Sequence, residues 1–320
     1  MLSAGGSRLI ALILAYKRIE KESITEDPFV SSVIGAVQLT LQEKGYFLLL
    51  YSNPDMEECV RISREWNVDG IILLGAKREG YYKIKASLSV PVVSIDTPFS
   101  AEDKDYVNVG LKDYEAAKEM TKYLLSMGHR KIAFFSLTEG GELLEKHYID
   151  SERYRGYKDA MEEEGLSAGV WHNLSFTEEW RKKQYLSFYE EKFFHATALF
   201  VTADIMALEM MRFCMDRGIS IPEQLSIAGF DGIKAGRCMH PMLTTMEQDS
   251  AEKGRKAVKE LLSLLSAGAC LFADAGEKQR VVSCKQEKEN SGNKVSDGEG
   301  RCKNILLPAK LFFGETVARI

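Results

Sequence analysis

The sequence predicts an α/β fold in which two doubly wound parallel sheets form two lobes. Short apolar runs of strand length alternate with longer amphipathic segments of helix length from Arg8 onward. This alternation is typical of parallel sheets that are covered by helices on both faces. The pattern restarts near Asp113, and a chain of 320 residues is long enough for more than one compact unit. We therefore expect two successive sheets.

The first series of elements starts with a buried strand. In the first helix Val33, Val37 and Leu41 recur at a spacing of four, which places them on one face. Gly45 follows, a residue suited to the left-handed turn after a helix. The series comprises strands over Arg8–Leu14, Phe47–Tyr51, Asp69–Leu74, Pro91–Ile95 and Asp105–Val109, and helices over Ser31–Lys44, Pro54–Trp66 and Tyr81–Leu88.

The second series repeats the same order of elements. It comprises helices over Asp113–Met127, Glu152–Glu164, Thr177–Phe193 and Asp204–Arg217, and strands over Lys131–Leu137, Val170–Leu174, Thr197–Val201 and Leu225–Gly229. A further amphipathic helix is expected over Ser250–Leu265 and a last strand over Ile305–Phe313. The polar stretch Gly276–Lys303 has too few apolar residues to form a core, so we expect a flexible loop there, with a functional lid as the alternative.

Composition and charge restrict the function. The 42 basic and 47 acidic residues give a net charge of −5, without the concentrated basic surface that DNA binding requires. The run Arg181-Lys182-Lys183 is interpreted as a solvated helix face. No apolar stretch is long enough to span a bilayer, and no signal peptide precedes the first strand. Scattered cysteines fit a reducing compartment, with one bridge such as Cys284–Cys302 as the alternative.

Common catalytic and cofactor motifs are absent from the sequence. It contains no phosphate-binding G-x-x-x-x-G-K-[ST], no G-x-G-x-x-G after the first strand, no H-E-x-x-H, no G-x-S-x-G and no EF-hand loop. The five histidines are scattered, and none lies at zinc-binding spacing from a cysteine. We therefore expect no cofactor, no metal and no catalytic residues, and a binding function is favoured.

Several short segments occur in an order that resembles the LacI-type transcription regulators. Each match is short, but together they extend from about Arg8 to Thr316. They are Asp27–Phe29 (DPF), Val68–Ile72 (VDGII), Pro91–Pro98 (PVVSIDTP), Gly128–Phe134 (GHRKIAF), Arg153–Tyr157 (RYRGY), Ala203–Ala207 (ADIMA), Ile221–Asp231 (IPEQLSIAGFD), Pro241–Gln248 (PMLTTMEQ) and the closing segment from Leu307 to Thr316.

The resemblance implies a periplasmic-binding-protein-like architecture of type I, with two lobes joined by three crossovers. The N-terminal lobe would hold residues 8–109 and 248–275, and the C-terminal lobe residues 110–247 and 304–320, with the flexible loop 276–303 before the last crossover. The family's helix-turn-helix head has no counterpart before Arg8. We therefore expect a cytoplasmic, homodimeric sensing domain that contacts operator DNA only through the absent head and has no membrane partner.

The resemblance also implies a set of effector-binding residues in the cleft between the lobes. Ligands of open parallel sheets bind beyond the carboxyl ends of the strands. Carboxylates there accept hydrogen bonds from hydroxyl or N–H groups, an arginine donates to ligand oxygens, and aromatic rings cover a sugar or base. The implied residues are Phe29, Asp96, Arg153, Phe176, Asp204, Asp231 and Gln248.

Most of these residues also have a purely structural interpretation. Asp204 is placed to cap its helix, because a side-chain oxygen there satisfies free backbone N–H groups. Asp231 is placed for a turn, and Arg153 has acidic neighbours on the surface. Phe29 is placed to act as a hydrophobic staple under its helix, and Phe176 has the size and polarity of a core residue. These alternatives stay open at the level of sequence.

Three departures from the family pattern affect the expected cleft. The family usually carries asparagine where this chain has Ala203, and Val-Asp-Asn where this chain has Val109-Gly110-Leu111. The asparagine of its N-P-F segment is Asp27 here. The resemblance implies a small-molecule effector, sugar or sugar-like, and these departures leave it unnamed.

Two other functions are compatible with the sequence. The first is a solute-binding protein of a sugar transporter, which would share the fold and the cleft. The second is an enzyme that uses the carboxylates of Asp96, Asp204 and Asp231 as acid and base. The regulator is favoured by the GHRKIAF and PMLTTMEQ segments and by the absence of a signal peptide.

Overall fold

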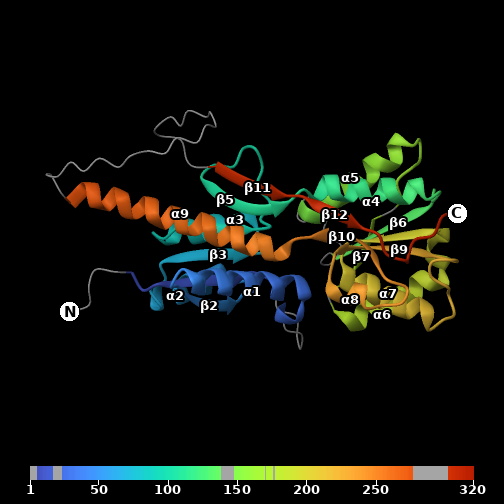
Figure 1. The fold of residues 1–320 in the computed structure, drawn as a ribbon, viewed down its shortest axis with the longest axis horizontal. Helices are drawn as coiled ribbons and strands as arrows, with labels where there is room; N and C mark the ends of the chain where they lie inside the picture. The colour runs from blue at the N-terminus through green and yellow to red at the C-terminus, as the bar shows by residue number, and fades with distance from the viewer. Residues whose placement is uncertain (1–5, 17–23, 138–147, 170, 176, 277–301) are drawn as a thin grey trace. The chain divides into compact units, whose positions relative to one another are not determined.

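The computed structural model describes residues 6–16, 24–137, 148–169, 171–175, 177–276 and 302–320. They divide into two compact units, each built on one six-stranded sheet (Figure 1). The first unit comprises residues 1–17, 34–110 and 251–305, and the second comprises residues 18–33, 111–250 and 306–320. The expected α/β class with two doubly wound, mostly parallel sheets is therefore confirmed.

The first sheet has the strand order β11-β5-β4-β3-β1-β2. Strands β1 to β5 pair in parallel, and β3 and β4 are buried along their whole length, as expected of strands with helices on both faces. The strands are β1 (Leu9–Leu14), β2 (Phe47–Ser52), β3 (Gly70–Leu74), β4 (Val92–Ile95), β5 (Tyr106–Leu111) and β11 (Cys302–Leu307). The accompanying helices are α1 (Pro28–Glu43), α2 (Met56–Glu65), α3 (Arg78–Ser87) and α9 (Ser250–Gly276), and the 3-10 turn η1 (Ile24–Glu26) precedes α1.

The second sheet repeats this arrangement with the order β12-β10-β9-β8-β6-β7. Strands β6 to β10 pair in parallel, and β12 runs antiparallel to β10. The strands are β6 (Ile132–Leu137), β7 (Trp171–Leu174), β8 (Ala198–Val201), β9 (Ser226–Asp231), β10 (Thr244–Gln248) and β12 (Ala309–Phe312). The helices are α4 (Asp113–Ser126), α5 (Tyr148–Glu163), α6 (Glu178–Glu190), α7 (Asp204–Met215) and α8 (Lys234–Arg237), with the 3-10 turn η3 (Lys192–His195).

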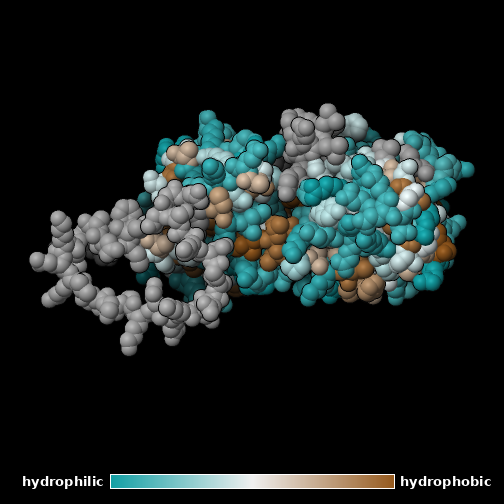
Figure 2. Space-filling view, turned by 90° about the horizontal axis from the view of Figure 1, so that it is seen from above, coloured by the Kyte–Doolittle hydropathy of each residue, from teal (hydrophilic) through white to brown (hydrophobic). Residues whose placement is uncertain are grey.

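Each unit has its own apolar core between sheet and helices. In the first unit, Tyr81 of α3 is buried and its hydroxyl donates to the carbonyl of Val92 (3.2 Å) and accepts from the amide of Val107 (3.2 Å), which ties α3 to β4 and β5. In the second unit, the hydroxyl of Tyr157 on α5 donates to the Ile132 carbonyl (2.6 Å) and accepts from the Gly169 amide (2.9 Å). The face drawn in Figure 2 is mostly hydrophilic, with hydrophobic residues in separate patches.

The end of the chain differs from the sequence prediction. We expected one strand over Ile305–Phe313, which is wrong: β11 and β12 lie on either side of Pro308 and belong to different sheets. Proline has no backbone N–H for the ladder, so the strand is interrupted there. The prediction also missed β10, whose sequence TTMEQ is not an apolar run. Of the loop expected over 276–303, residues 277–301 lie outside the described residues.

Candidate functional site

Polar side chains of the second unit gather where three neighbouring parallel strands end. Thr202 follows β8, Asp231 is the last residue of β9, and Gln248 is the last residue of β10. Because the carboxyl ends of parallel strands lie at one edge of a sheet, these residues share that edge. We refer to this edge, with the side chains of Arg153, Asp231 and Gln248, as the carboxyl-edge site.

Arg153 is brought to this edge by the close packing of α5 on α4. A Cβ on Gly156 would lie 2.2 Å from the carbonyl oxygen of Tyr114, so only glycine lets the two helices approach this closely. One turn earlier on α5, Arg153 donates from Nε to Oδ1 of Asp113 (2.8 Å), which is the first residue of α4. The R-x-x-G-Y segment therefore has a physical basis, because its glycine sets the position of its arginine.

The guanidinium of Arg153 is buried and firmly held. Its Nη1 donates to the carbonyl of Thr202 (2.8 Å), and its Cζ lies 3.7 Å from the centre of the Phe230 ring. Burial alone would lower the pKa of Arg153, but the carboxylates of Asp113, Asp231 and Asp150 raise it. Arg153 is therefore a permanent cation. It does not pair with Glu152, which is engaged by Arg155.

Asp231 and Gln248 form a direct contact. Nε2 of Gln248 donates to Oδ1 of Asp231 over 2.6 Å. Gln248 is 7% exposed, and among the residues that the structure describes its Oε1 has no hydrogen-bond partner. A buried acceptor without a donor is costly in free energy. This atom is therefore an acceptor that the described residues leave unsatisfied.

The half-buried carboxyl group of Asp231 prefers to be protonated. Desolvation raises its pKa, and the negative charges of Asp204 and Asp27 raise it further. Arg153 opposes this shift, but its charge is already shared with Asp113. Asp231 thus accepts or donates a hydrogen bond according to what is bound beside it.

Asp204 is completely buried and bonded within the second unit. It accepts hydrogen bonds from the hydroxyl of Thr245 (2.6 Å) and the amide of Ile233 (2.8 Å). A Cβ on Gly229 would lie 2.2 Å from its Oδ1, so the glycine of the segment ending in GFD makes room for this carboxylate. Asp204 therefore joins β10 to the loop after β9. It does not cap α7, whose N-cap is Ala203 with no side-chain hydrogen bond.

Two further carboxylates lie within electrostatic range of Arg153 or Asp231. Asp150 on α5 accepts a hydrogen bond from the hydroxyl of Thr202 (3.3 Å), and burial raises its pKa to about 6. Asp27 caps the start of α1 by accepting from the amides of Phe29 (2.8 Å) and Val30 (3.2 Å), and burial raises its pKa as well. The ring of Phe29 is half-buried. Phe176 lies outside the described residues.

Asp96 belongs to the first unit and is engaged in a buried ion pair. It follows β4 with a left-handed backbone (φ 58°), and both of its carboxylate oxygens accept from Nζ of Lys253 (2.7 and 2.8 Å). Both side chains are buried. The structure therefore brings Arg153, Asp231 and Gln248 together, whereas it places Asp204 in an internal network and Asp96 in an internal ion pair.

Sequence reasoning missed several of these partners. Lys253 shares the inward face of α9 with Ala257 and Leu261, so a lysine on an otherwise apolar face was the available signal. Asp113 and Thr202 carried no such signal, because their role depends on where α5 places Arg153.

The interpretation of Arg181 as part of a solvated face is wrong. Its guanidinium is buried and pairs in two places with Glu209 of α7 (2.8 and 2.7 Å), and Nη1 donates to the carbonyl of Ser175 (3.1 Å). Lys182 and Lys183 do lie on the surface and pair with Glu178 and Glu179 one turn earlier. Position 181 faces α7, whereas its two neighbours in sequence point away from it.

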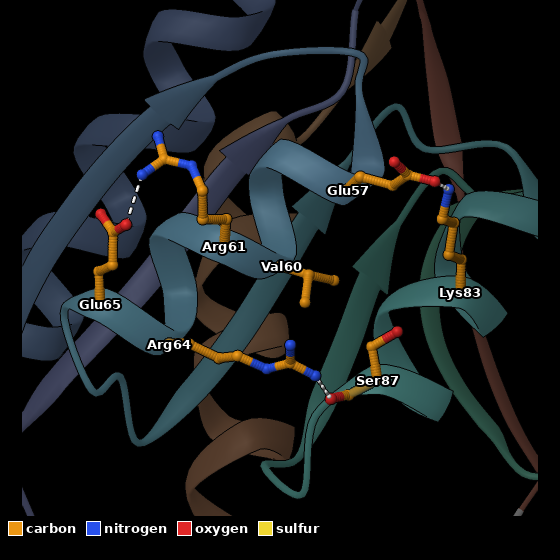
Figure 3. Close-up of a pocket in the computed structure, with 7 residues that line it drawn as sticks. All are labelled: Glu57, Val60, Arg61, Arg64, Glu65, Lys83 and Ser87. Carbon is orange, nitrogen blue, oxygen red and sulfur yellow. Dashed lines mark hydrogen bonds and ion pairs between the residues drawn. The ribbon is translucent and has the colours of Figure 1, made fainter.

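A separate cavity lies between α2 and α3 of the first unit (Figure 3). Its charged groups are already matched within the wall: Glu57 pairs with Lys83 (2.8 Å), and Arg64 donates to the carbonyl of Ser87 (2.7 Å). Arg61 pairs with Glu65. The cavity between α2 and α3 contains none of the residues at the strand ends, so we do not assign effector binding to it.

The described residues contain neither a cluster arranged to hold a metal ion nor a membrane-spanning helix. No group of three or more histidine, cysteine, aspartate or glutamate side chains in them is arranged to hold a metal ion. Within the same residues, no helix is both long and apolar enough to cross a membrane.

Comparison with protein families and curated proteins gives consistent matches. The family model "Periplasmic binding protein-like domain" matches residues 121–282, just over half of the chain. The HTH-type transcriptional regulator MalR of Clostridium butyricum is 27% identical over 275 residues, which cover 80% of this chain and 75% of MalR. The HTH-type transcriptional repressor CytR of Escherichia coli K12 is 26% identical over 266 residues, covering 81% of this chain and 74% of CytR.

Solved structures share the fold along nearly the whole chain. The transcriptional regulator CelR in complex with cellobiose superposes with a TM-score of 0.76 at 18% identity, covering 97% of this chain and 85% of that one. A LacI family regulator from Enterococcus faecium with bound ribose gives a TM-score of 0.73 at 20% identity, covering 98% and 99%.

Proposed function

Since this chain belongs to the periplasmic binding protein-like family, as the effector-binding domain of a LacI-type regulator, we propose that a small sugar-like effector binds at the carboxyl-edge site. Such a ligand controls DNA binding by having different affinities for the regulator's two functional states. The proposal is supported by two structures with the same fold, which hold cellobiose and ribose.

The observation that carries the proposal is the unmatched hydrogen-bonding capacity at this edge. Gln248 offers a buried acceptor, and Asp231 offers a carboxyl group beside it. Arg153 uses Nε and Nη1 for Asp113 and Thr202, and none of the described residues accepts from its Nη2. A polyol supplies both donors and acceptors at close spacing, so it matches this set.

We propose that the domain binds its ligand without chemical turnover. Of the three carboxylates that an enzyme would need, Asp204 is bonded to Thr245 and Ile233, and Asp96 is paired with Lys253. Neither is free to exchange a proton with a substrate. The relatives that the chain matches are transcription regulators, which supports the same view and a cytoplasmic location.

We also propose that the protein acts as a homodimer. Three large apolar side chains of the first unit are exposed on α1 and β2, namely Leu39, Phe47 and Leu50. Exposed apolar groups on neighbouring elements are typical of subunit contacts. Light scattering should give the mass of two chains, and the variant Phe47→Glu should give the mass of one.

Thermal unfolding of the purified protein with a panel of sugars and nucleosides tests the binding proposal. A ligand at one hundred times its Kd stabilises the folded state by about 2.7 kcal/mol. The variant Gln248→Ala should lose this stabilisation, whereas Gln42→Ala, which changes an exposed glutamine of α1, should keep it. Equal stabilisation of both variants would remove Gln248 from the site, and no stabilisation by any compound would contradict the sugar-like effector.

A further inference from the structure

We propose that the effector carries a protonated nitrogen as well as hydroxyl groups, as an amino sugar does. This inference rests on the effector-binding function proposed above and specifies the charge of the ligand. It is carried by an excess of carboxylates around Arg153, together with the unpartnered acceptor of Gln248.

The charges of the site do not balance. Asp113 matches the charge of Arg153 through a contact of 2.8 Å. Asp231 and Asp150 also interact electrostatically with Arg153, and Asp27 interacts with Asp231. Among the residues that the structure describes, Asp27, Asp150 and Asp231 form no ion pair with a lysine or arginine. Asp150 and Asp231 thus share one cation that is already paired with Asp113, and Asp27 adds a further half-buried carboxyl group within electrostatic range of Asp231.

Gln248 independently indicates that the site lacks a hydrogen-bond donor. Gln248 is only 7% exposed, and its Oε1 has no donor within the described residues. Its Nε2 is fixed by Asp231, so the amide presents the oxygen as an acceptor beside that carboxylate. A carboxylate and an amide oxygen side by side form the acceptor pair that suits an ammonium group with its three N–H donors.

A metal ion would be an alternative source of positive charge. The described residues contain no group of three or more acidic, histidine or cysteine side chains arranged to hold one. The acceptors are instead distributed along an edge that also contains the donor Arg153, which suits a ligand with hydroxyl oxygens next to its nitrogen. An organic ammonium ion therefore fits the site better than a bare cation.

The carboxyl groups are prepared for such a ligand. Desolvation raises the pKa of each of Asp27, Asp150 and Asp231, so each of these carboxyl groups is protonated more readily than an exposed one. A cationic ligand favours the ionised carboxylates instead, and the pair then gains a charge-assisted hydrogen bond.

Matched sugar pairs test the proposal directly. The probes are D-glucosamine, D-galactosamine and D-mannosamine, each compared with its parent sugar and its N-acetyl derivative by calorimetry at pH 6.5. We expect at least one amino sugar to bind about tenfold more tightly than both neutral partners, which corresponds to one additional favourable charge contact.

The charge requirement is tested with two variants. Asp27→Asn keeps the helix cap, because asparagine caps as well as aspartate, but removes one negative charge. It should reduce the preference for the amino sugar at least threefold. The control Asp216→Asn changes an exposed aspartate of the same unit that pairs with Arg212, and the preference should not change.

Each outcome decides the question. If a parent sugar binds as tightly as its amino sugar in every pair that binds, the ammonium proposal is wrong, although the proposed effector function stands. If Asp27→Asn leaves the preference for the amino sugar unchanged, the carboxylates do not recognise the charge of the ligand, and the proposal is wrong for that reason. If none of the nine probes binds, the ammonium inference is overturned, and the wider sugar panel described above decides separately whether the effector is sugar-like.

Discussion

Nε2 of Gln248 donates a hydrogen bond of 2.6 Å to Oδ1 of Asp231 and so links the ends of β10 and β9. The contact fixes the orientation of the amide, because the nitrogen faces the carboxylate and the oxygen remains as a buried acceptor. Asp231 in turn interacts electrostatically with Arg153. Three residues from separate parts of the chain thereby form one polar edge, and the residues around it can be tested separately from ligand binding.

Removal of Lys253 should destabilise the first unit. The variant Lys253→Met leaves the buried carboxylate of Asp96 without its cation, and breaking a buried pair in this way costs about 3 kcal/mol or more. Urea unfolding should show this loss. The double variant Lys253→Met, Asp96→Asn should recover most of it, because asparagine also tolerates the left-handed backbone at position 96. No recovery in the double variant would contradict a role based on the ion pair.

The charge of Asp150 should make stability depend on pH. Its pKa is raised to about 6 in the folded protein, so the folded state binds the proton more tightly than the unfolded state does. The stability contributed by this proton is present below about pH 4 and is lost as pH rises through about 6. The variant Asp150→Asn should therefore gain about 1–3 kcal/mol relative to the wild type between pH 4 and pH 7.5. If the difference in stability between Asp150→Asn and the wild type stays the same across this pH range, the pKa of Asp150 is not raised.

Replacement of Gly156 should disturb the packing of α5 on α4. The new Cβ would meet the carbonyl oxygen of Tyr114 at 2.2 Å, and neither backbone can move without displacing its helix. We expect Gly156→Ala to lower the free energy of unfolding by about 2–3 kcal/mol, as overpacking does. In α1, by contrast, Gly35 has no atom within 4 Å of its would-be Cβ, and Gly35→Ala should stabilise by up to about 1 kcal/mol. Similar effects of the two substitutions would contradict the close approach.

Arg181 and Lys182 should differ sharply although they are adjacent. Arg181→Ala leaves Glu209 without its cation, with the Tyr185 hydroxyl as a remaining donor, and removes a donor to the Ser175 carbonyl. We expect a loss of about 3 kcal/mol in chemical unfolding. Lys182→Ala removes only a surface pair with Glu178 and should change stability by less than about 1 kcal/mol. The opposite order would restore the solvated-face interpretation.

Most of the fold could be predicted because its signals are local. Apolar runs mark β1, β3 and β8, and periodic apolar faces mark α1 and α4, so neither depends on distant parts of the chain. The failures occurred where the local signal is weak. The strand β10 is half polar, and the division at Pro308 depends on which sheet each half joins.

The site could be predicted only in part, because sequence position does not specify contacts. The family resemblance implied Arg153, Asp231 and Gln248 as site residues, and the structure places Asp231 and Gln248 at strand ends and Arg153 on α5. It could not show that Asp96 is paired with Lys253, which lies 157 residues away in sequence. Nor could it show that Asp204 accepts a hydrogen bond from the hydroxyl of Thr245. Such long-range partners are determined by packing and leave little trace in a single sequence.

The central claim is that the carboxyl-edge site binds the effector, and Arg153 gives its most direct test. Calorimetry should compare the wild type with Arg153→Lys, which keeps the positive charge beside Asp113 but loses the planar set of donors. The matched control is Arg155→Lys, an exposed arginine two residues away that pairs with Glu152. With the tightest ligand of the sugar panel, we expect Arg153→Lys to weaken binding at least about tenfold, or 1.4 kcal/mol, and Arg155→Lys to leave it unchanged. Equal affinity of Arg153→Lys and the wild type would contradict the account.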